Sequence, residues 1–328
     1  MSYVPFLSAI VAFVVTYIAT NWLIRYLRRI NLVVKDMNKK NTPLVPISGG
    51  LSVMSGIFTG LMIYIFIQTF YYKYTSTLIY LLAGLISILM ITFVGFLDDL
   101  IIKKSKESSK GLKQWQKPLL TLSAAVPLMV VNAGVTTMTF PILGRIDIGL
   151  IYPLILIPIG VVGAANMINI LAGFNGIEVG MGIVYTGMLG LYAYFNNREV
   201  AVVLSLITLF ALIAFYFYNK YPAKILPGDS LTYLLGAIIA CIAILGNIEK
   251  AAVIASIPFF IEFVLKLRSK FKAKSYGYFE NGKIKSYHNN KIYSIPHLLT
   301  RTGRYTEKQV FWFMILIELL FSSLIWVV

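Results

Sequence analysis

Two adjacent carboxylates close a long apolar run. The stretch ITFVGFLDDLI puts Asp98 and Asp99 side by side in a chain with only 13 acidic residues among 328. The C-terminal end of a helix disfavours negative charge, so capping alone does not explain the pair. Two neighbouring carboxylates are better explained by a cation nearby. Lys117, before Pro118 at the start of the next apolar run, could serve there or be an ordinary interfacial anchor.

The segment NMINILAGFNGIEVG, residues 166–180, is polar where the surrounding chain is apolar. Asn166 and Asn169 are three residues apart and therefore share one helical face. Three glycines then interrupt the segment, and Asn175 and Glu178 lie among them. Irregular backbone near a membrane survives only where protein or a polar cavity satisfies it. The segment therefore predicts a binding site rather than a simple connection.

Asp229 follows Pro227-Gly228 and precedes an apolar run. Plain N-capping is one interpretation of that position. Carboxylate and amide oxygens together suit Mg²⁺, and the numerous Lys and Arg residues suit phosphate. Phosphoryl chemistry at a membrane surface is the resulting hypothesis, and the residue types alone do not identify the substrate.

The elements that must position these residues are membrane-spanning helices. Hydrophobic residues make up 58% of the chain and charged residues 13%, against about 25% charged in soluble domains, and the mean hydropathy is +0.79. We predict one all-α polytopic domain over residues 1–328. Cys241 is the single cysteine, so no intrachain disulfide can form. The ten expected spans are 4–27, 48–70, 77–97, 118–133, 149–165, 179–195, 199–218, 231–246, 250–267 and 309–328.

Basic residues predict the orientation of these spans. All 29 Lys and Arg residues except Lys73, Arg145, Arg198 and Lys250 fall in or beside the odd-numbered loops. Basic residues favour cytoplasmic loops, so the odd loops are expected in the cytoplasm and both termini outside. Residues 266–308 form the one large cytoplasmic loop, with a hairpin turn at Asn281-Gly282. A second, external β-hairpin is expected within 135–149.

The ordered set of loop motifs resembles the polyprenyl-phosphate N-acetylhexosamine-1-phosphate transferases of the glycosyltransferase 4 family. The stretch NILAGFNGIEVG is similar to the archaeal and eukaryotic dolichyl-phosphate members, whereas bacterial members usually have Asp at the positions of Ala172 and Asn175. The large loop lacks the His-rich motif of bacterial members. The first loop fits the family spacing Asp36-x-Asn38-Lys39, then Pro46-x-Ser48-x-Gly50.

The resemblance implies a reaction and a role for each matching residue. Polyprenyl (dolichyl) phosphate would attack UDP-GlcNAc, releasing UMP and forming lipid-diphosphate-GlcNAc, the first step of lipid-linked (N-glycan) assembly. The implied roles are Mg²⁺ binding (Mn²⁺ as a substitute) by Asn169 and Asp229; catalysis by Asp98, Asp99 and Lys117; uridine contact by Asn175 and Glu178; lipid-phosphate contact by Lys39; and donor contact by Arg268, Lys270, Lys272 and Lys274.

We compare this prediction with three other functions. A secondary transporter would place charges near the membrane midplane and show paired halves. Apart from Glu199 at the first position of its span, Glu262 and Glu318 are the only acids within the expected spans, and we detect no repeat. A transferase with a CDP-linked donor would need an Asp-Gly dipeptide, which the chain lacks. The same reaction with another UDP-N-acetylhexosamine is the third. As partners we expect membrane lipids and no nucleic acid, and a homodimer is open.

Overall fold

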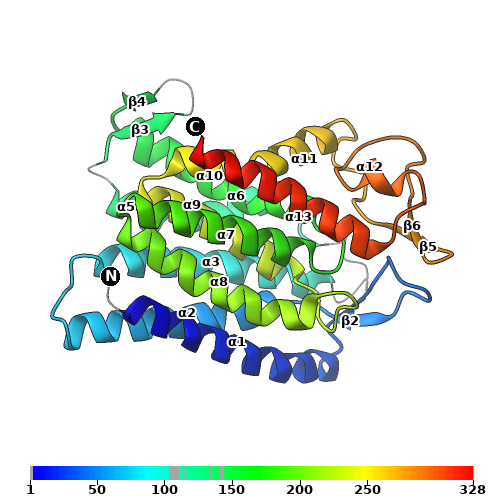
Figure 1. Cartoon of the computed structure of the whole chain (residues 1–328), viewed down its shortest axis with the longest axis horizontal. Coiled ribbons are helices and arrows are strands. Elements are labelled where there is room, and N and C mark those ends of the chain that lie inside the picture. The colour runs from blue at the N-terminus through cyan, green and yellow to red at the C-terminus, as the bar shows by residue number, and fades with distance from the viewer. Residues whose placement is uncertain (1–2, 103–110, 114, 133–134, 141–143, 328) are drawn as a thin grey trace.

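The computed structural model describes residues 3–102, 111–113, 115–132, 135–140 and 144–327. Its long elements are helices that run side by side (Figure 1). In chain order they are α1 (Val4–Arg29), α2 (Gly50–Phe70), α3 (Leu78–Ile102), α4 (Gln116–Leu122), α5 (Val126–Val131), α6 (Ile157–Leu171), α7 (Ile177–Phe195), α8 (Glu199–Asn219), α9 (Gly228–Gly246), α10 (Glu249–Ala255), α11 (Ile257–Leu267), α12 (His297–Thr300) and α13 (Glu307–Ser323). Short helical stretches join or extend them: 3₁₀-helices at Ser123–Ala125 and Leu324–Trp326, and a π-helix at Tyr152–Leu156.

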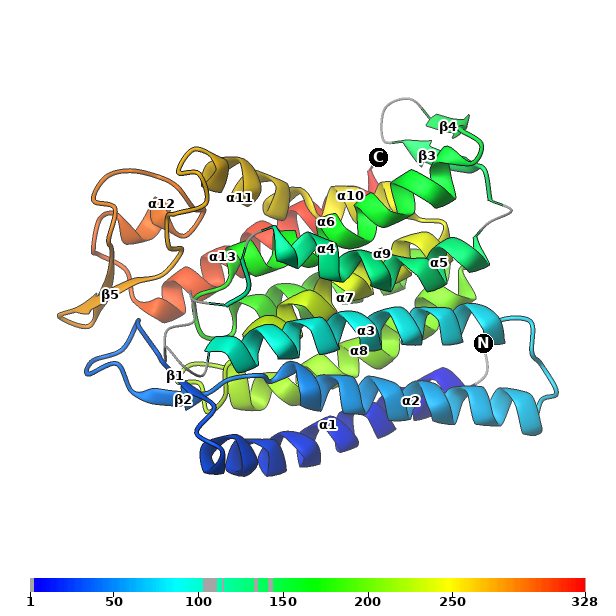
Figure 2. The same cartoon turned by 180° about the vertical axis from the view of Figure 1, so that it is seen from behind.

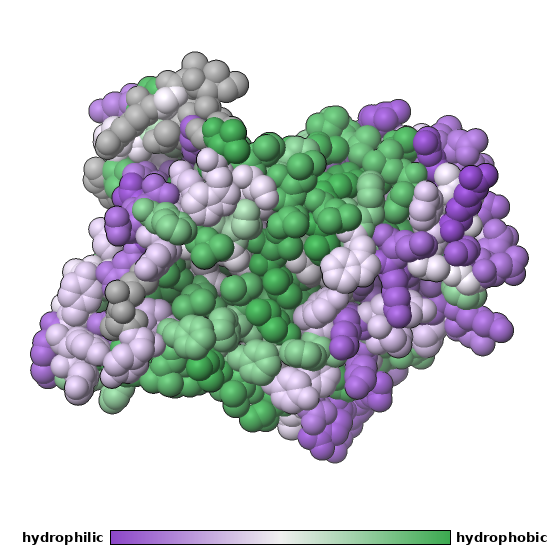
Figure 3. Space-filling model, viewed as in Figure 1, coloured by the Kyte–Doolittle hydropathy of each residue, from purple (hydrophilic) through white to green (hydrophobic). Residues whose placement is uncertain are grey.

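The protein is a helical membrane protein with several spans. Within the described residues, seven helical stretches are long and apolar enough to cross a bilayer: α1, α2, α3, α8, α9, Tyr152–Leu171 and Glu307–Trp326. A broad apolar surface lies between two hydrophilic ends, as expected for a protein embedded in lipid (Figure 3).

The other three expected spans are helical but do not meet that standard. The run 118–133 is divided into α4 and α5, and the run 250–267 into α10 and α11. Pro127 and Pro258 stand in the first turns after these breaks, where proline cannot continue the preceding ladder of hydrogen bonds. The third run forms α7, of 19 residues. The ten-span count is therefore a proposal, taken up below.

Several helix boundaries differ from those expected, and three of the differences bear directly on the site. Helix α3 continues past residue 97 to Ile102, α6 continues past residue 165 to Leu171, and α9 begins at Gly228 rather than residue 231. Asp98, Asn169 and Asp229 consequently lie on helix ends instead of in loops. Lys117 of α4 holds the Asp98 and Asp229 side chains, and hydropathy alone does not reveal such support.

Helix α9 is the core element, and the large majority of its residues are buried. Close approach of its neighbours depends on glycine. A Cβ added to Gly95 of α3 would lie 2.3 Å from the Asp229 carbonyl oxygen, and one added to Gly236 of α9 would lie 2.4 Å from the Ala164 oxygen of α6. Backbone contact of this kind fixes the N-terminal end of α9 against α3 and the middle of α9 against α6.

Small antiparallel hairpins occupy both ends of the bundle. Strands β3 (Thr137–Phe140) and β4 (Gly144–Asp147) pair near the two chain termini, while β1 (Val33–Lys35) with β2 (Leu44–Pro46), β5 (Gly277–Glu280) with β6 (Lys283–Ser286), and α12 lie at the opposite end (Figures 1 and 2). Hairpins were expected at β3–β4 and β5–β6, and both are present; β1–β2 was not expected. The basic run 103–110 lies outside the described residues.

Candidate functional site

Asp98 lies at the C-terminal end of α3 and pairs with Lys117 at the start of α4. Its Oδ2 is 2.7 Å from the Lys117 Nζ, and the Leu112 N–H donates to its Oδ1 at 2.5 Å. The Asp98 side chain is wholly buried. Because a buried carboxylate needs such partners to remain charged, the ion pair accounts for an acid at this helix end.

Asp99 has different partners and caps α9. Its Oδ1 accepts from the Asp229 N–H at 2.7 Å, and its Oδ2 accepts from the Ser230 N–H at 3.1 Å and from the Ser48 hydroxyl at 2.8 Å. The first N–H groups of a helix lack intrahelical partners, and a carboxylate satisfies them well. Gly228 enters this turn with φ of +71°, and a Cβ there would lie 2.5 Å from the Asp99 Oδ2. The turn formed by Pro227, Gly228, Asp229 and Ser230 therefore surrounds and hydrogen-bonds the Asp99 carboxylate.

Asp229 joins the two arrangements. Its Oδ2 is 3.2 Å from the same Lys117 Nζ that pairs with Asp98, and its backbone N–H donates to Asp99. Three carboxylates thus converge, and within the described residues Lys117 is the only ammonium paired with them. An excess of negative charge at this point favours a bound cation.

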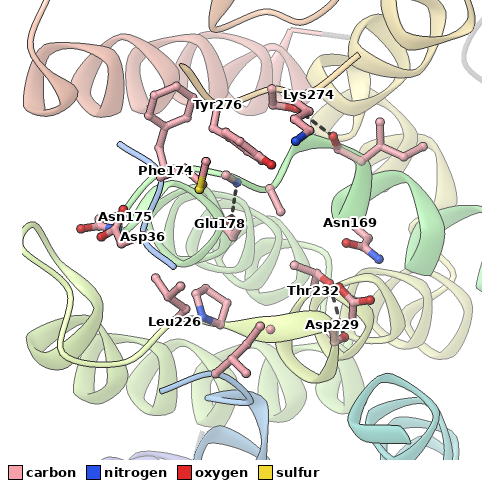
Figure 4. Close-up of a pocket in the computed structure, with 18 of the residues that line it drawn as sticks. Asp36, Asn169, Phe174, Asn175, Glu178, Leu226, Asp229, Thr232, Lys274 and Tyr276 are labelled. Atoms are coloured by element: carbon pink, nitrogen blue, oxygen red, sulfur yellow. Dashed lines mark hydrogen bonds between the residues drawn. The ribbon is translucent and has the colours of Figure 1, made fainter. Parts of the chain in front are cut away.

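A cavity of about 490 Å³ opens beside this cluster. Asn169, Asp229 and Thr232 lie together on one side of it, and Asn175 and Asp36 lie on the other (Figure 4). Asn169 comes from the last turn of α6 and Asp229 from the first turn of α9, so the ends of two packed helices bring both oxygen-bearing side chains to one wall. Apolar residues among the lining include Met37, Phe174 and Leu226.

Asn175 and Glu178 both line this cavity, as the sequence led us to expect. The Asn175 amide donates to the Asp36 Oδ2 at 3.1 Å, and its Oδ1 accepts from the Ala223 N–H at 3.0 Å. An amide has two N–H donors and two acceptor lone pairs. One donor and one lone pair of Asn175 therefore have no partner among the described residues. Glu178 accepts from the Gly173 N–H at 3.0 Å through Oε1, while its buried Oε2 has no hydrogen-bond partner among the described residues.

Lys39 lines neither the cavity described above nor a second, adjoining cavity that is described below. It forms a close ion pair with Glu307 and a second at 3.4 Å with Asp36, and its Nζ lies 4.4 Å from the Tyr221 ring centroid. Two carboxylates offset its charge. The geometry therefore favours a structural role that ties the first loop to α13.

The four basic residues of the large loop separate into two pairs. Lys272 and Lys274 line the cavity. Arg268 and Lys270 lie outside its lining, and the Arg268 Nη1 contacts the Ile292 carbonyl oxygen at 3.4 Å. The structure thus brings two of the four predicted cations to the site.

Lys266 was missed by the sequence analysis. It lines the first cavity and also a second cavity of about 410 Å³, whose other lining residues include Lys117, Asn166, Asn169, Phe263 and Phe271. Asn169 and Lys266 stand where the two cavities meet. Lys266 occupies the end of an apolar run, where a lysine is the usual interfacial anchor. A buried Glu262 one turn earlier, 3.9 Å away, was the available signal.

Comparison with known proteins bears on this site. The family model described as glycosyl transferase family 4 matches residues 81–247, which include α3, α6 and α9. A protein of Saccharolobus solfataricus is 34% identical over 93% of this chain and 90% of its own length. The chain belongs to glycosyl transferase family 4.

Other members differ in the activity for which they are named. A Dictyostelium discoideum protein, 28% identical over 88% of this chain and 79% of its own, is named UDP-N-acetylglucosamine–dolichyl-phosphate N-acetylglucosaminephosphotransferase, and the Saccharolobus protein carries the same name provisionally. A Staphylococcus epidermidis protein, 29% identical over 78% of this chain and 81% of its own, is named phospho-N-acetylmuramoyl-pentapeptide-transferase.

Proposed function

We propose that the protein transfers GlcNAc-1-phosphate from UDP-GlcNAc to polyprenyl (dolichyl) phosphate, releasing UMP. The observation that carries this proposal is the meeting of two cavities at Asn169 and Lys266, next to Asp229 and Lys117. Two cavities that converge on one set of cations and oxygen ligands suit a reaction between two phosphate-bearing substrates. The names of the Saccharolobus and Dictyostelium relatives support the choice of substrates.

The larger cavity suits the nucleotide sugar. It has polar walls from Asn175 and Glu178, and the ammonium groups of Lys272 and Lys274 come from its outer wall. An amide offers a donor and an acceptor to a base edge, and Lys side chains attract a diphosphate. Its size is within the range of about 300–1,000 Å³ that ligand pockets usually have.

The second cavity suits the lipid phosphate. Pro118, Phe263 and Phe271 provide apolar wall, and Lys117 and Lys266 provide positive charge. An isoprenoid phosphate requires this combination of apolar surface and cations. Contact between Lys39 and the lipid phosphate, as the family resemblance implies, stays a prediction; Lys117 and Lys266 are better placed.

A divalent cation fits the residues beside Asp229. The converging carboxylates exceed the paired ammonium charge, and the Asn169 amide borders the same cavity as Asp229. Mg²⁺ commonly takes one or two protein oxygens and completes its shell with substrate phosphates; Mn²⁺ accepts similar ligands. Asp229 and Asn169 would hold the ion, which when bound would offset charge on the donor diphosphate.

The reaction exchanges one phosphoanhydride bond for another. An oxygen of the lipid phosphate attacks the phosphorus that carries the sugar, the bond from that phosphorus to the bridging oxygen breaks, and UMP leaves with the electron pair. Lys117 reduces repulsion between the approaching anions, and Asp98 holds the Lys117 ammonium in place. Asp99 acts further away by fixing the turn that carries Asp229. A lipid phosphate is already ionised near neutral pH, so no strong base is needed.

The proposed topology has ten spans, with the site and the loop 266–308 in the cytoplasm and the termini and hairpin β3–β4 outside. The distribution of basic residues supports it, because positive charge favours the cytoplasmic side. The presence of β3–β4 and both termini at the end of the bundle opposite β5–β6 is compatible with it.

A second candidate is the same reaction with another UDP-N-acetylhexosamine. The Staphylococcus relative is named for a muramoyl-pentapeptide substrate, which favours keeping this alternative. The test of both is an assay of the purified protein with UDP-GlcNAc and other UDP-sugars, each with polyprenyl phosphate, in which lipid product and nucleotide are identified. Product from UDP-GlcNAc together with UMP supports the proposal; turnover of only another sugar supports the alternative, and turnover of none contradicts both.

A further inference from the structure

The outer wall of the larger cavity is a short segment of irregular backbone. Residues 272–276 all line the cavity, and 272–274 belong to no helix or strand (Figure 4). Backbone N–H and C=O groups outside regular structure still need hydrogen-bond partners when they are withdrawn from water. The partners of this segment therefore decide whether it is fixed or loose.

Two histidines hold the Lys274 backbone from both sides. The Lys274 N–H donates to the His288 Nε2 at 3.2 Å, and the His297 Nε2 is 3.0 Å from the Lys274 carbonyl oxygen. The His297 Nδ1 accepts from the Tyr293 N–H at 3.2 Å. Because Nδ1 accepts, the ring proton is on Nε2, and Nε2 donates to Lys274. The two contacts in which a ring nitrogen accepts, at the His288 Nε2 and the His297 Nδ1, require neutral rings.

Neighbouring peptides are held in the same way. The buried Lys266 Nζ donates to the Ala273 carbonyl oxygen at 2.7 Å, and the Ser275 hydroxyl donates to the Ile170 carbonyl oxygen of α6 at 3.2 Å. The Gly277 N–H donates to the Asn38 Oδ1 at 3.2 Å. Four side chains thus satisfy backbone groups between residues 273 and 277, those of Asn38, Lys266, His288 and His297. The Ser275 hydroxyl ties the segment to α6.

We propose that His288 and His297 are positioning residues that preorganise the segment 272–276, so that Lys272 and Lys274 face the nucleotide-sugar cavity before the donor binds. This inference rests on the proposed function. A wall fixed in advance avoids the entropy cost of ordering a loop around the ligand. The histidines act through the Lys274 backbone and need not touch the substrate themselves.

The surroundings of the histidines are consistent with neutral rings. His297 is fully buried, and the His288 and His297 ring centroids are 5.2 Å apart. Burial and the nearby Lys266 ammonium lower the pKa of both rings, that of His297 to about 4, and the Lys274 ammonium also lowers the pKa of His288. A proton on either ring would repel the nearby Lys266 and Lys274 ammonium groups, which belong to residues that line the cavity.

The test compares His297→Leu, which removes the donor to Lys274, with His297→Gln, whose side-chain amide can replace the Nε2–H. His288→Leu removes the second contact, and Lys291→Leu, an exposed residue of the same loop, is the control. Loss of one buried hydrogen bond to the wall should raise the KM for UDP-GlcNAc about tenfold in the two histidine-to-leucine variants. We expect little change in kcat or in the KM for lipid phosphate, recovery in His297→Gln, and no effect in Lys291→Leu.

The Kd for UDP-GlcNAc, measured by calorimetry on the same variants, separates this inference from the proposed function. Absence of UMP release by the unaltered protein would contradict the proposed function, and the Kd comparison would still judge the histidines. Donor KM and Kd equal to those of the unaltered protein in His297→Leu and His288→Leu would overturn the positioning role. So would equal losses in His297→Leu and His297→Gln, because the effect would then not depend on the donated hydrogen bond. Melting temperatures of all variants show whether folding is retained.

Discussion

At the scale of single residues, two neighbours with the same carboxylate have different tasks. Asp98 pairs with Lys117, which borders the second cavity. Asp99 accepts two N–H groups from the start of α9 and a hydroxyl from Ser48. Adjacent side chains on a helix point in different directions, so a contiguous pair can serve two partners. The ion pair of Asp98 and the hydrogen bonds to Asp99 also offset the repulsion between the two negative charges.

Asp98→Asn should lower kcat more than it raises the donor KM. The substitution keeps the side-chain volume but removes the charge that holds the Lys117 ammonium, and we expect that ammonium to matter chiefly as charge develops during transfer. Steady-state kinetics with UDP-GlcNAc varied at saturating lipid phosphate measure both constants. A rise in donor KM at unchanged kcat would show instead that Asp98 supports only binding.

Asp99→Ala should lower both kcat and stability. It leaves two N–H groups at the start of α9 without their acceptor, and each buried unsatisfied group costs about 1–3 kcal/mol. Asp99→Asn, which retains one acceptor oxygen, should lower kcat more than it raises the donor KM and should lose less stability than the alanine variant. Thermal unfolding in detergent and turnover, measured on one preparation, check this. An alanine variant with the melting temperature of the unaltered protein would contradict the capping role.

At the scale of elements, the site depends on how closely α3 and α6 approach the start of α9. The turn at Gly228 is restricted in two ways, because both its positive φ and the nearby Asp99 exclude a side chain. Gly282, in the β5–β6 turn, also has a positive φ, of +80°, but nothing lies within 4 Å of a Cβ built there. A comparison of substitutions at these two glycines therefore distinguishes the cost of backbone strain from the cost of a steric clash.

Gly228→Ala should be markedly more harmful than Gly282→Ala. Both variants carry the cost of a left-handed alanine, about 1–2 kcal/mol, and only Gly228→Ala also displaces Asp99 and the Asp229 turn. We expect Gly282→Ala to keep nearly full kcat and Gly228→Ala to lose most of it. Equal melting temperatures and equal kcat in the two variants would refute the steric argument.

The loop 266–308 should weaken in mild acid through His297. Its folded pKa of about 4 lies below the ordinary value of 6.5, so the unfolded chain binds more protons between these values. The contribution to stability is fully present above about pH 6.5 and is lost as pH falls through 4. The melting temperature of the unaltered protein should therefore fall more between pH 7 and pH 4 than that of His297→Gln. Parallel curves for the two proteins would argue against a buried neutral ring.

The sequence predicted most of the helices, whereas the side-chain contacts between distant helices could not be deduced from local patterns. Apolar runs are local, so the regions of α1, α2 and α8 could be predicted to within a few residues, and Asn281-Gly282 identified the β5–β6 turn. The contact of Lys117 with Asp229 spans 112 positions and depends on how α4 and α9 pack. The same limit applies to Lys39: its neutralisation by Glu307, far along the chain, cannot be deduced from the spacing of the first loop.

At the scale of the whole molecule, the site lies near the end of the bundle that carries β1–β2, β5–β6 and α12 (Figures 1 and 4). The proposed topology makes this end cytoplasmic, where UDP-sugars are supplied. The second cavity has apolar wall from Pro118, Phe263 and Phe271, which suits an acceptor that arrives through lipid. One orientation thus explains both substrates: a soluble donor arrives from the polar end and a lipid acceptor from the membrane.

Cysteine labelling can test that orientation directly. Cys241, the single native cysteine, is fully buried in α9, so it should give little background. Asn281→Cys in the β5–β6 turn should react with a membrane-impermeant maleimide only after the cells are opened. Asp147→Cys, at the end of β4, should react in intact cells. The reverse pattern would invert the topology and move the site to the outside.

The central claim is that the bond broken lies between the two phosphates of the donor, and the released nucleotide tests it most directly. Purified protein should be incubated with UDP-GlcNAc labelled in the phosphate next to the sugar, with dolichyl phosphate and Mg²⁺. We predict that the nucleotide product is UMP, that the labelled phosphate passes to the lipid, and that Asp229→Ala or a chelator abolishes both. Release of UDP with the label still on the nucleotide would contradict the account, since a simple glycosyl transfer would then be the reaction.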